Sequence, residues 1–125
     1  LIKNKNTEDK LRVFINPKIT FQSKTKSLIY EGCGSLGDIF GPVIRPREVE
    51  VEAFDEKGVK FALRADGILA RIIFHEMDHL SGVEFIQKVS DYGKIVTKKH
   101  YRKNIRNSKL QRNNSKISKI EYKTL

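Results

Sequence analysis

Residues 48–82 read EVEVEAFDEKGVKFALRADGILARIIFHEMDHLSG, and two hydrophobic periods meet within them. Over residues 48–54 acidic and apolar side chains alternate strictly, which is typical of a β-strand with one wet face and one buried face. Gly58 suits the positive φ of a tight turn, and the alternation returns over residues 59–63. We therefore predict an antiparallel hairpin whose acidic row faces solvent.

The hydrophobic period changes at Asp66-Gly67, after which apolar residues recur at helical spacing through residues 68–80. Gly82 suits the left-handed residue that ends many helices. Residues 83–86 are apolar enough to predict a short strand after the helix.

Upstream of the hairpin, residues 11–15 (LRVFI) are β-branched and aromatic and predict a strand that Asn16-Pro17 ends, with a continuation at residues 19–21. These elements predict an α+β fold in which antiparallel β-sheets surround one central helix, followed by a basic C-terminal helix or tail. We expect five apolar side chains in the core: Phe14, Phe54, Phe61, Ile72 and Leu80.

The composition is typical of one folded globular domain, since 38% of the 125 residues are hydrophobic and 32% are charged. No apolar run approaches the roughly 18 to 20 residues that a membrane span needs, so we expect no membrane partner. The single cysteine, Cys33, excludes an internal disulfide and with it the framework of a small secreted domain.

Positive charge is concentrated in one part of the chain. The total is 25 Lys and Arg against 15 Asp and Glu, but residues 91–125 hold 11 of these cations and only two acids, Asp91 and Glu121. We therefore divide the chain into a near-neutral body, residues 1–90, and a basic C-terminal extension. The extension has two interpretations, a solvated tail or an arm that lies on phosphates. The arm would use Lys98, Lys99, Arg102, Lys103 and Arg106.

The segment HEMDH, residues 75–79, lies within the predicted helix. Positions four apart on a helix differ by about 40° and about 6 Å along the axis, so His75 and His79 can reach one metal ion from the same face. Glu76 stands close enough to act as a base for a water molecule without binding the metal. The alternative is a pair of surface histidines flanked by solvated acids.

A catalytic metal needs a third protein ligand, and three residues are candidates. Glu84 follows His79 by five positions but lies beyond the predicted helix end, and His100 lies among cations that disfavour a metal. Cys33 stands between Gly32 and Gly34, and its thiolate would complete a Cys/His/His site with one position open. A lone cysteine is otherwise a small buried filler.

Residues 31–35, EGCGS, followed by residues 75–80, HEMDHL, resemble the second and third motifs of peptide deformylases, and residues 12–17, RVFINP, resemble that family too. The resemblance implies a hydrolase that removes the N-terminal formyl group from the formylmethionine of nascent polypeptides. It also implies one divalent metal held by Cys33, His75 and His79, natively Fe2+ and replaceable by Zn2+ or Ni2+.

The resemblance also implies roles around the metal. Glu76 would be the general base, and the backbone N–H of Gly34 would stabilise the oxygen of the formyl group. Two further roles are predicted from the residues themselves and not from the resemblance. Glu31, close to Cys33 in the chain, would hydrogen-bond a histidine ligand or make only a local loop contact. Arg45, between the cysteine motif and the hairpin, would receive a peptide carbonyl or carboxylate, or be solvated.

The resemblance further implies that the basic extension contacts the ribosome. We expect a monomer in the cytoplasm of a bacterium or in an organelle.

The family usually has Leu at the position of Gly34 and Gln at that of Phe74. Its Gly-rich first motif is absent here, so we expect the chain to be the later part of a longer protein whose catalytic domain continues upstream. Two alternatives to a deformylase stay open. One is an HExxH zinc peptidase with a downstream ligand, and the other is an inactive remnant that binds the ribosome or RNA.

Overall fold

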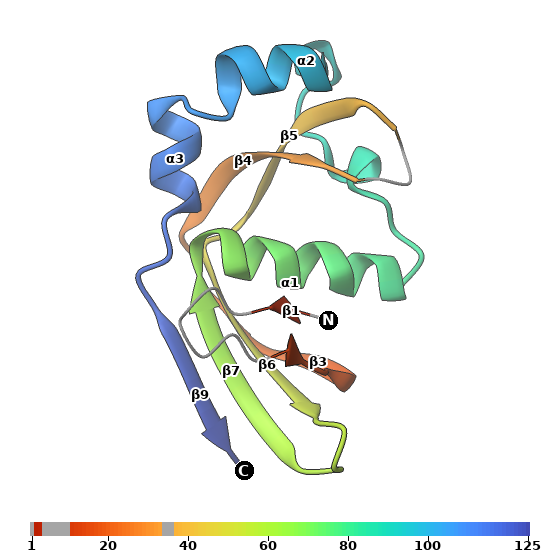
Figure 1. Ribbon diagram of the computed structural model, residues 1–125, viewed down its shortest axis with the longest axis vertical. Coiled ribbons are helices and arrows are strands. Elements are labelled where there is room, and N and C mark those ends of the chain that lie inside the picture. The colour runs from red at the N-terminus through yellow and green to blue at the C-terminus, as the bar shows by residue number, and fades with distance from the viewer. Residues whose placement is uncertain (1, 4–10, 34–36) are drawn as a thin grey trace.

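The computed structural model describes residues 2–3, 11–33 and 37–125. Its strands form antiparallel sheets in the orders β1-β2, β3-β6-β7-β9 and β4-β5-β8. Figure 1 shows helix α1 (Gly67–Leu80) between the four-stranded sheet and the β4–β5 hairpin. The predicted α+β class with antiparallel sheets is confirmed.

The predicted hairpin is the centre of the larger sheet. Strand β6 (Glu48–Phe54) pairs with β7 (Lys60–Asp66), and Gly58 between them has φ 78°. The apolar row of both strands is buried, and its best-covered members pair directly across the hairpin, Val49 with Ala65. This row forms the core against which α1 packs.

Helix α1 begins and ends where its sequence signals predict. Asp66 is the N-cap, and Gly82, just past the end, has φ 75°. The face of α1 that packs on the hairpin carries Ala70, Ile73 and Phe74, all buried. Phe74, at the position where the resemblance predicts a glutamine, thus fills core volume.

Strand β3 (Ile15–Gln22) corrects the prediction that Asn16-Pro17 ends the first strand. The strand runs through both residues because Asn16 adopts φ 51° and the pairing with β6 shifts between Ile15 and Lys18. Such a bulge on an edge strand accommodates a proline, which has no N–H to donate to the ladder.

The prediction of a strand at residues 83–86 is wrong. A 3-10 helix, η2 (Phe85–Lys88), forms instead, and its start is closed by a capping box between Glu84 and Gln87. The apolar residue Phe85 is buried against Val43 and Val89 in a second, smaller core. A capped turn buries this residue as effectively as a strand would.

The core predictions hold only in part. Phe61 is 1% exposed and Phe14 packs beside it, but Phe54, Ile72 and Leu80 are 37%, 40% and 71% exposed. The apolar stripe of α1 is wider than the sheet that covers it, so Ile72 and Leu80 remain at the surface. Both line cavities beside the HExxH segment.

The second sheet and the C-terminal residues complete the fold. Strand β4 (Lys26–Gly32) pairs with β5 (Ile39–Pro46), and β5 pairs with β8 (Val96–Thr97). The remaining elements are β1 (Ile2–Lys3), β2 (Leu11–Arg12), η3 (Tyr92–Lys94), α2 (Lys98–His100), the π-helix η4 (Tyr101–Ile105), α3 (Lys109–Ser115) and β9 (Ile120–Thr124).

The basic C-terminal residues are therefore folded onto the body and do not form a solvated tail. Strand β9 pairs with β7 at the edge of the larger sheet, and α3 lies beside β4 (Figure 1). None of the helices within the described ranges is both long and apolar enough to cross a lipid bilayer.

Candidate metal centre and cleft

Three of the predicted site residues come together at one end of α1. Cys33 follows the last residue of β4, and His75 and His79 lie one turn apart on the helix. Their ligand atoms all lie within 4.8 Å of one another. The Cys33 Sγ is 3.6 Å from Nε2 of His79, and the two imidazole centroids are 4.5 Å apart.

These distances fit a bound divalent metal. A tetrahedral ion with ligand bonds of about 2.3 Å to sulfur and about 2.0–2.1 Å to nitrogen separates those two ligand atoms by about 3.6 Å. One thiolate and two imidazoles are also a donor set that suits zinc and iron. The hairpin of β4 and β5 carries the cysteine, so the sheet and the helix position the site jointly.

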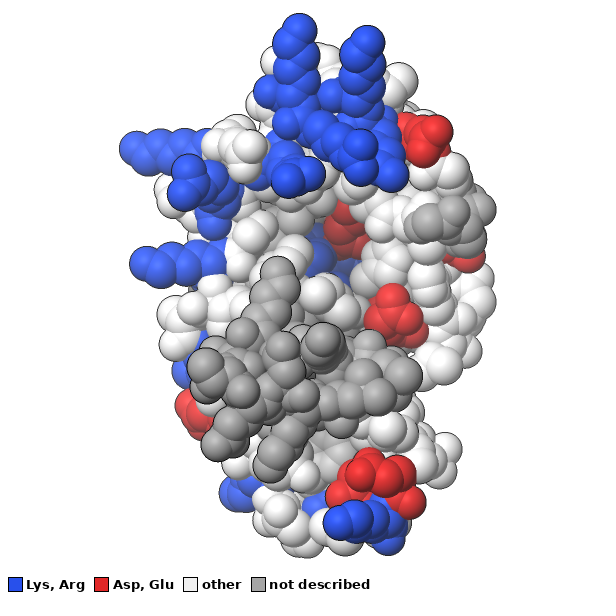
Figure 2. Space-filling view, in the orientation of Figure 1, with Lys and Arg blue, Asp and Glu red and all other residues white. Residues whose placement is uncertain are grey.

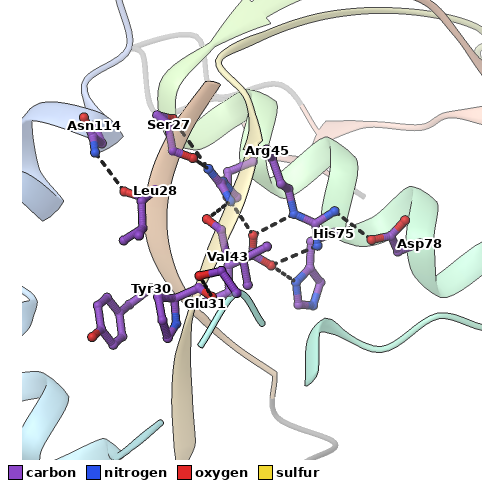
Figure 3. A network of polar contacts seen from close by, with 12 residues as sticks. Ser27, Leu28, Tyr30, Glu31, Val43, Arg45, His75, Asp78 and Asn114 are labelled. Carbon is purple, nitrogen blue, oxygen red and sulfur yellow. Dashed lines mark hydrogen bonds and ion pairs between the residues drawn. The ribbon is translucent and has the colours of Figure 1, made fainter. Parts of the chain in front are cut away.

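Glu31 holds one histidine from behind. Its Oε1 lies 3.0 Å from Nδ1 of His75, and its other oxygen accepts from Nε of Arg45 at 2.8 Å. Arg45 also donates to Asp78 Oδ2 at 2.7 Å, as Figure 3 shows. The Glu31 contact engages the Nδ1 side of His75, which leaves Nε2 available as the ligand atom.

Arg45 lies behind Glu31, away from both the solvent and the cleft. It is only 6% exposed, and its guanidinium forms ion pairs with Glu31 and Asp78. The prediction that Arg45 is solvated is therefore wrong, and the guanidinium is engaged by two carboxylates of the chain itself. Its position between two acids far apart in the chain could not be inferred from residue spacing.

Hydrogen bonds and nearby charges shift the pKa values of Glu31 and His75 toward their ionised forms. Burial alone would raise the pKa of Glu31, but hydrogen bonds from His75, Arg45 and Arg71 outweigh burial and lower the pKa to about 2. The hydrogen bond with Glu31 raises the pKa of His75 to about 9, against the opposing effect of burial. Glu31 is therefore a carboxylate at any neutral pH and a firm acceptor for Nδ1–H.

Arg71 is a member of this cluster that the sequence reasoning missed. It is 4% exposed and donates to Glu31 Oε2 at 2.9 Å, to the Val43 carbonyl at 2.8 Å and to the Ser27 carbonyl at 2.8 Å. It thus ties α1 to β4 and β5. The available signal was a lone cation within the apolar stripe, one turn before His75.

Two acids flank His79. Glu76 is 58% exposed at the side chain, and its Oε2 is 4.0 Å from Nδ1 of that histidine. Glu84 Oε2 lies 3.3 Å from Nε2 of His79, although Glu84 does not share the common ligand cluster of Cys33, His75 and His79. The proposed oxyanion donor Gly34 lies outside the described residues.

A cleft of about 560 Å³ opens beside the metal centre. Its floor is the exposed face of α1 with Ile68 and Ile72, and one end is formed by Cys33, His75 and Glu76. The C-terminal residues supply the other wall: Tyr101, Arg106, Gln111, Arg112 and Ser115. This contribution of the tail could not be expected from the body alone.

The basic residues divide between two surfaces. Lys98, Lys99, Arg102 and Lys103 line a shallow depression at the end of the molecule where Figure 2 shows Lys and Arg gathered. Arg106, which we grouped with them from the sequence, lines the cleft beside the metal centre.

Known proteins resemble this chain in sequence. A family model described as polypeptide deformylase matches residues 1–94. A peptide deformylase of Treponema pallidum (strain Nichols) is 46% identical over 86 residues, which are 69% of this chain and 53% of that protein. Peptide deformylase 1 of Ralstonia nicotianae is 47% identical over 98 residues, 75% of this chain and 58% of that protein. The chain thus spans little more than half the length of these relatives.

Solved structures resemble it in fold. A peptide deformylase of Synechococcus elongatus in complex with actinonin superposes with TM-score 0.64 and 44% identity, over 66% of this chain and 46% of that one. A Plasmodium falciparum peptide deformylase in complex with an inhibitor gives 0.63 and 41%, over 74% of this chain and 57% of that one. Members of this family use a divalent metal, which agrees with the cluster of Cys33, His75 and His79. The chain belongs to the polypeptide deformylase family.

Proposed function

We propose that this chain provides the catalytic residues of a peptide deformylase, which releases formate from the formylmethionine of nascent polypeptides. The observation that carries the proposal is the convergence of Cys33, His75 and His79 within 4.8 Å, with Glu76 at the mouth of the adjoining cleft. All four residues lie within residues 1–90, which we take as the catalytic domain, with residues 91–125 as a basic C-terminal extension.

Cys33, His75 and His79 would hold one divalent metal, and we propose Fe2+ as the native ion, with Zn2+ or Ni2+ as substitutes. When bound, the ion supplies Lewis acidity to a carbonyl and lowers the pKa of water. Glu31 fixes the orientation of His75 through Nδ1, and Arg45 and Arg71 fix Glu31 in turn.

Glu76 is placed to move the proton. It lines the cleft and carries an exposed carboxylate beside His79. We assign it the proton of the water whose oxygen attacks the formyl carbon. As the bond between that carbon and the methionine nitrogen breaks, Glu76 returns the proton to the leaving amine, and formate departs. We also assign the Gly34 backbone N–H to the formyl oxygen.

The apolar part of the cleft would bind the methionine side chain. Ile72, three residues before His75 on α1, lines it and is 40% exposed although it lies on an apolar stripe. A flexible thioether packs well against branched aliphatic side chains. Contact with the methionine side chain would explain why the apolar residue Ile72 is exposed.

We propose ribosome contact through Lys98, Lys99, Arg102 and Lys103. Four cations around one shallow depression suit the phosphates of RNA, and Asp38 is the acid that shares the depression with them. Such a contact would place a monomeric enzyme where formylated chains emerge, in a bacterial cytoplasm or an organelle.

The test is formate release from formyl-Met-Ala-Ser by the purified chain, loaded with Fe2+ without oxygen. We expect Glu76→Gln to lower kcat by about 100-fold or more while metal stays bound. Glu56→Gln, in the exposed turn of the hairpin, is the matched control and should act like the wild type. A wild-type chain that binds metal but releases no formate would overturn the proposal.

A further inference from the structure

The C-terminal segment is fixed against the cleft by an aromatic stack. The Tyr101 ring lies on that of Phe40, with centroids 3.9 Å apart and planes 1° from parallel. Both rings line the cleft. Residues 101–115 follow the residues 1–94 that the family model matches.

Helix α3 is fixed on the outer edge of β4. Gln111 is 6% exposed, and its amide accepts from Tyr30 N at 3.0 Å and donates to the Tyr30 carbonyl at 3.2 Å. Asn114 donates to the Leu28 carbonyl at 2.8 Å. Two side chains thus occupy the strand edge opposite β5 as a neighbouring strand would, and they set the position of α3.

The end of α3 meets the start of α1. A side-chain carbon at Gly67 would collide with the carbonyl oxygens of Ser115 and Lys116, so the two backbones are in close approach there. Arg112 lies one turn before Ser115, and both line the cleft. Arg112 is therefore near the start of α1, at the end of the cleft remote from His75.

A π-turn brings a second arginine to the cleft. Arg106 N donates to the Tyr101 carbonyl at 2.8 Å, a bond between residues five apart. In a regular α-helix such residues point about 140° away from each other. The wider turn allows Tyr101 and Arg106 to line the same cleft.

The ionisable groups of the cleft leave these two arginines as its unbalanced charges. Arg71 and Glu31 neutralise each other, and Glu76 lies at the metal centre. Within the described ranges, neither Arg106 nor Arg112 forms an ion pair with a carboxylate. Both side chains belong to exposed residues and remain free to contact a bound peptide.

We propose that Arg106 and Arg112 make this enzyme selective for formylated peptides with an acidic side chain two or three residues after methionine. The inference rests on the proposed deformylase activity. From His75 back to Ile68 is seven residues of helix, about 10 Å, which an extended peptide covers in about three residues. A carboxylate at that point of the peptide would meet the two guanidinium groups.

The experiment compares kcat/KM for formyl-Met-Ala-Xaa-amide peptides with Xaa as Glu, Gln or Lys. The terminal amide removes the free carboxylate as a competing anion. For exposed ion pairs we expect the Glu peptide to exceed the Lys peptide by about fivefold, with Gln between them, and the ratio to shrink in high salt. Arg106→Gln/Arg112→Gln should bring the ratio near one, and Arg106→Glu/Arg112→Glu should invert it.

The matched control is Lys109→Gln/Lys123→Gln, which removes two cations of the same segment that do not line the cleft. It should keep the wild-type ratio, and circular dichroism shows whether each variant is folded. The inference would be overturned if the wild type showed equal kcat/KM for the three peptides, or if the Arg106/Arg112 variants left the ratio unchanged. Formate release in the same assays would still support the proposed function.

Failure of the proposed function gives a different result, since no peptide would then release formate. The charge preference is measured in that case by calorimetric binding of the same peptides to this chain. The inference is supported, even when no formate is released, if the wild type binds the Glu peptide more tightly than the other two peptides. The Arg106→Gln/Arg112→Gln variant should then bind all three peptides equally. Equal binding of the three peptides to the wild type refutes the inference.

Discussion

At the scale of single residues, His79 Nε2 has two possible companions, with Cys33 Sγ at 3.6 Å and Glu84 Oε2 at 3.3 Å. Cys33 also shares the ligand cluster with His75, whereas Glu84 does not. We therefore predict that Cys33→Ser loses the metal and formate release together. Glu84→Gln should keep the metal, because it removes no ligand.

Substitution of cobalt for the native metal tests directly whether Cys33 is a metal ligand. The wild type and Glu84→Gln should show the near-ultraviolet sulfur-to-cobalt charge-transfer band, and Cys33→Ser should lack it. If Glu84→Gln lost the metal while Cys33→Ser kept it, the site would be that of an HExxH peptidase with a downstream ligand.

The buried carboxylate of Glu31 supports a second prediction at this scale. Glu31→Gln keeps the shape of the side chain but removes the charge that orients His75 and that Arg45 and Arg71 neutralise. We expect metal affinity to fall by about 10- to 100-fold, as when other groups that orient ligands are changed. Competition with a chelator measures this fall, and an unchanged affinity would contradict the role of Glu31.

At the scale of elements, Arg71 joins α1 to the β4–β5 hairpin through Glu31 and the carbonyls of Val43 and Ser27. Arg71→Met leaves those acceptors buried with one partner fewer, so we expect about 3 kcal/mol less free energy of unfolding. Urea unfolding measures this loss. Arg64→Met is the control, because its ion pairs with Glu48 and Glu50 are partly exposed and should cost less than about 1 kcal/mol.

The elements also show what could be predicted from sequence. The hairpin and α1 were predictable because each burial pattern is local, down to Gly58 and Gly82 at their ends. Strand β3 was not, because a bulge at Asn16 rescues a proline that normally ends a strand. The 3-10 helix that begins within residues 83–86 was not predictable either, because so short a segment with apolar residues fits a strand and a capped 3-10 turn equally well.

The residues of the site also divide into those that could be predicted from the sequence and those that could not. Spacing within one helix predicted that His75 and His79 share a face, and the family motifs supplied Cys33 and Glu31. The only local signal for Arg71 was a cation within an apolar stripe, and nothing local placed Arg106 or Arg112 at the cleft, because these roles depend on contacts between segments far apart in the chain. Their charges gave no hint of a cleft in the sequence.

At the scale of the whole molecule, the C-terminal segment closes the larger sheet and walls the cleft, and Asp66 fastens it to the body. The Asp66 carboxylate accepts from the backbone N–H of Ser118 at 2.7 Å and of Lys119 at 2.9 Å, and from the Ser118 hydroxyl. Burial alone would raise the pKa of Asp66, but these hydrogen bonds and the nearby Arg47 outweigh burial and lower it below its ordinary value of 3.8. Asp66 is the last residue of β7 and the N-cap residue of α1, so its carboxylate links the end of β7 to the residues that lead into β9.

A carboxyl whose pKa is lower in the folded state stabilises that state above its ordinary pKa, and the stabilisation is lost as the pH falls through the folded pKa. We predict that Asp66→Asn lowers the free energy of unfolding at pH 7 by about 1–3 kcal/mol. The gap between wild type and variant should narrow below a pH of 3.8 and close when Asp66 is protonated in the folded chain.

Urea unfolding from pH 7 to pH 2.5 measures this gap in the free energy of unfolding, and Asp91→Asn, at an exposed residue, is the control. A gap that stays constant over that range would show that Asp66 does not act through its charge. Amide exchange in β9 should quicken in Asp66→Asn at neutral pH, since the residues that lead into the strand then lose the charged acceptor for the Ser118 and Lys119 N–H groups.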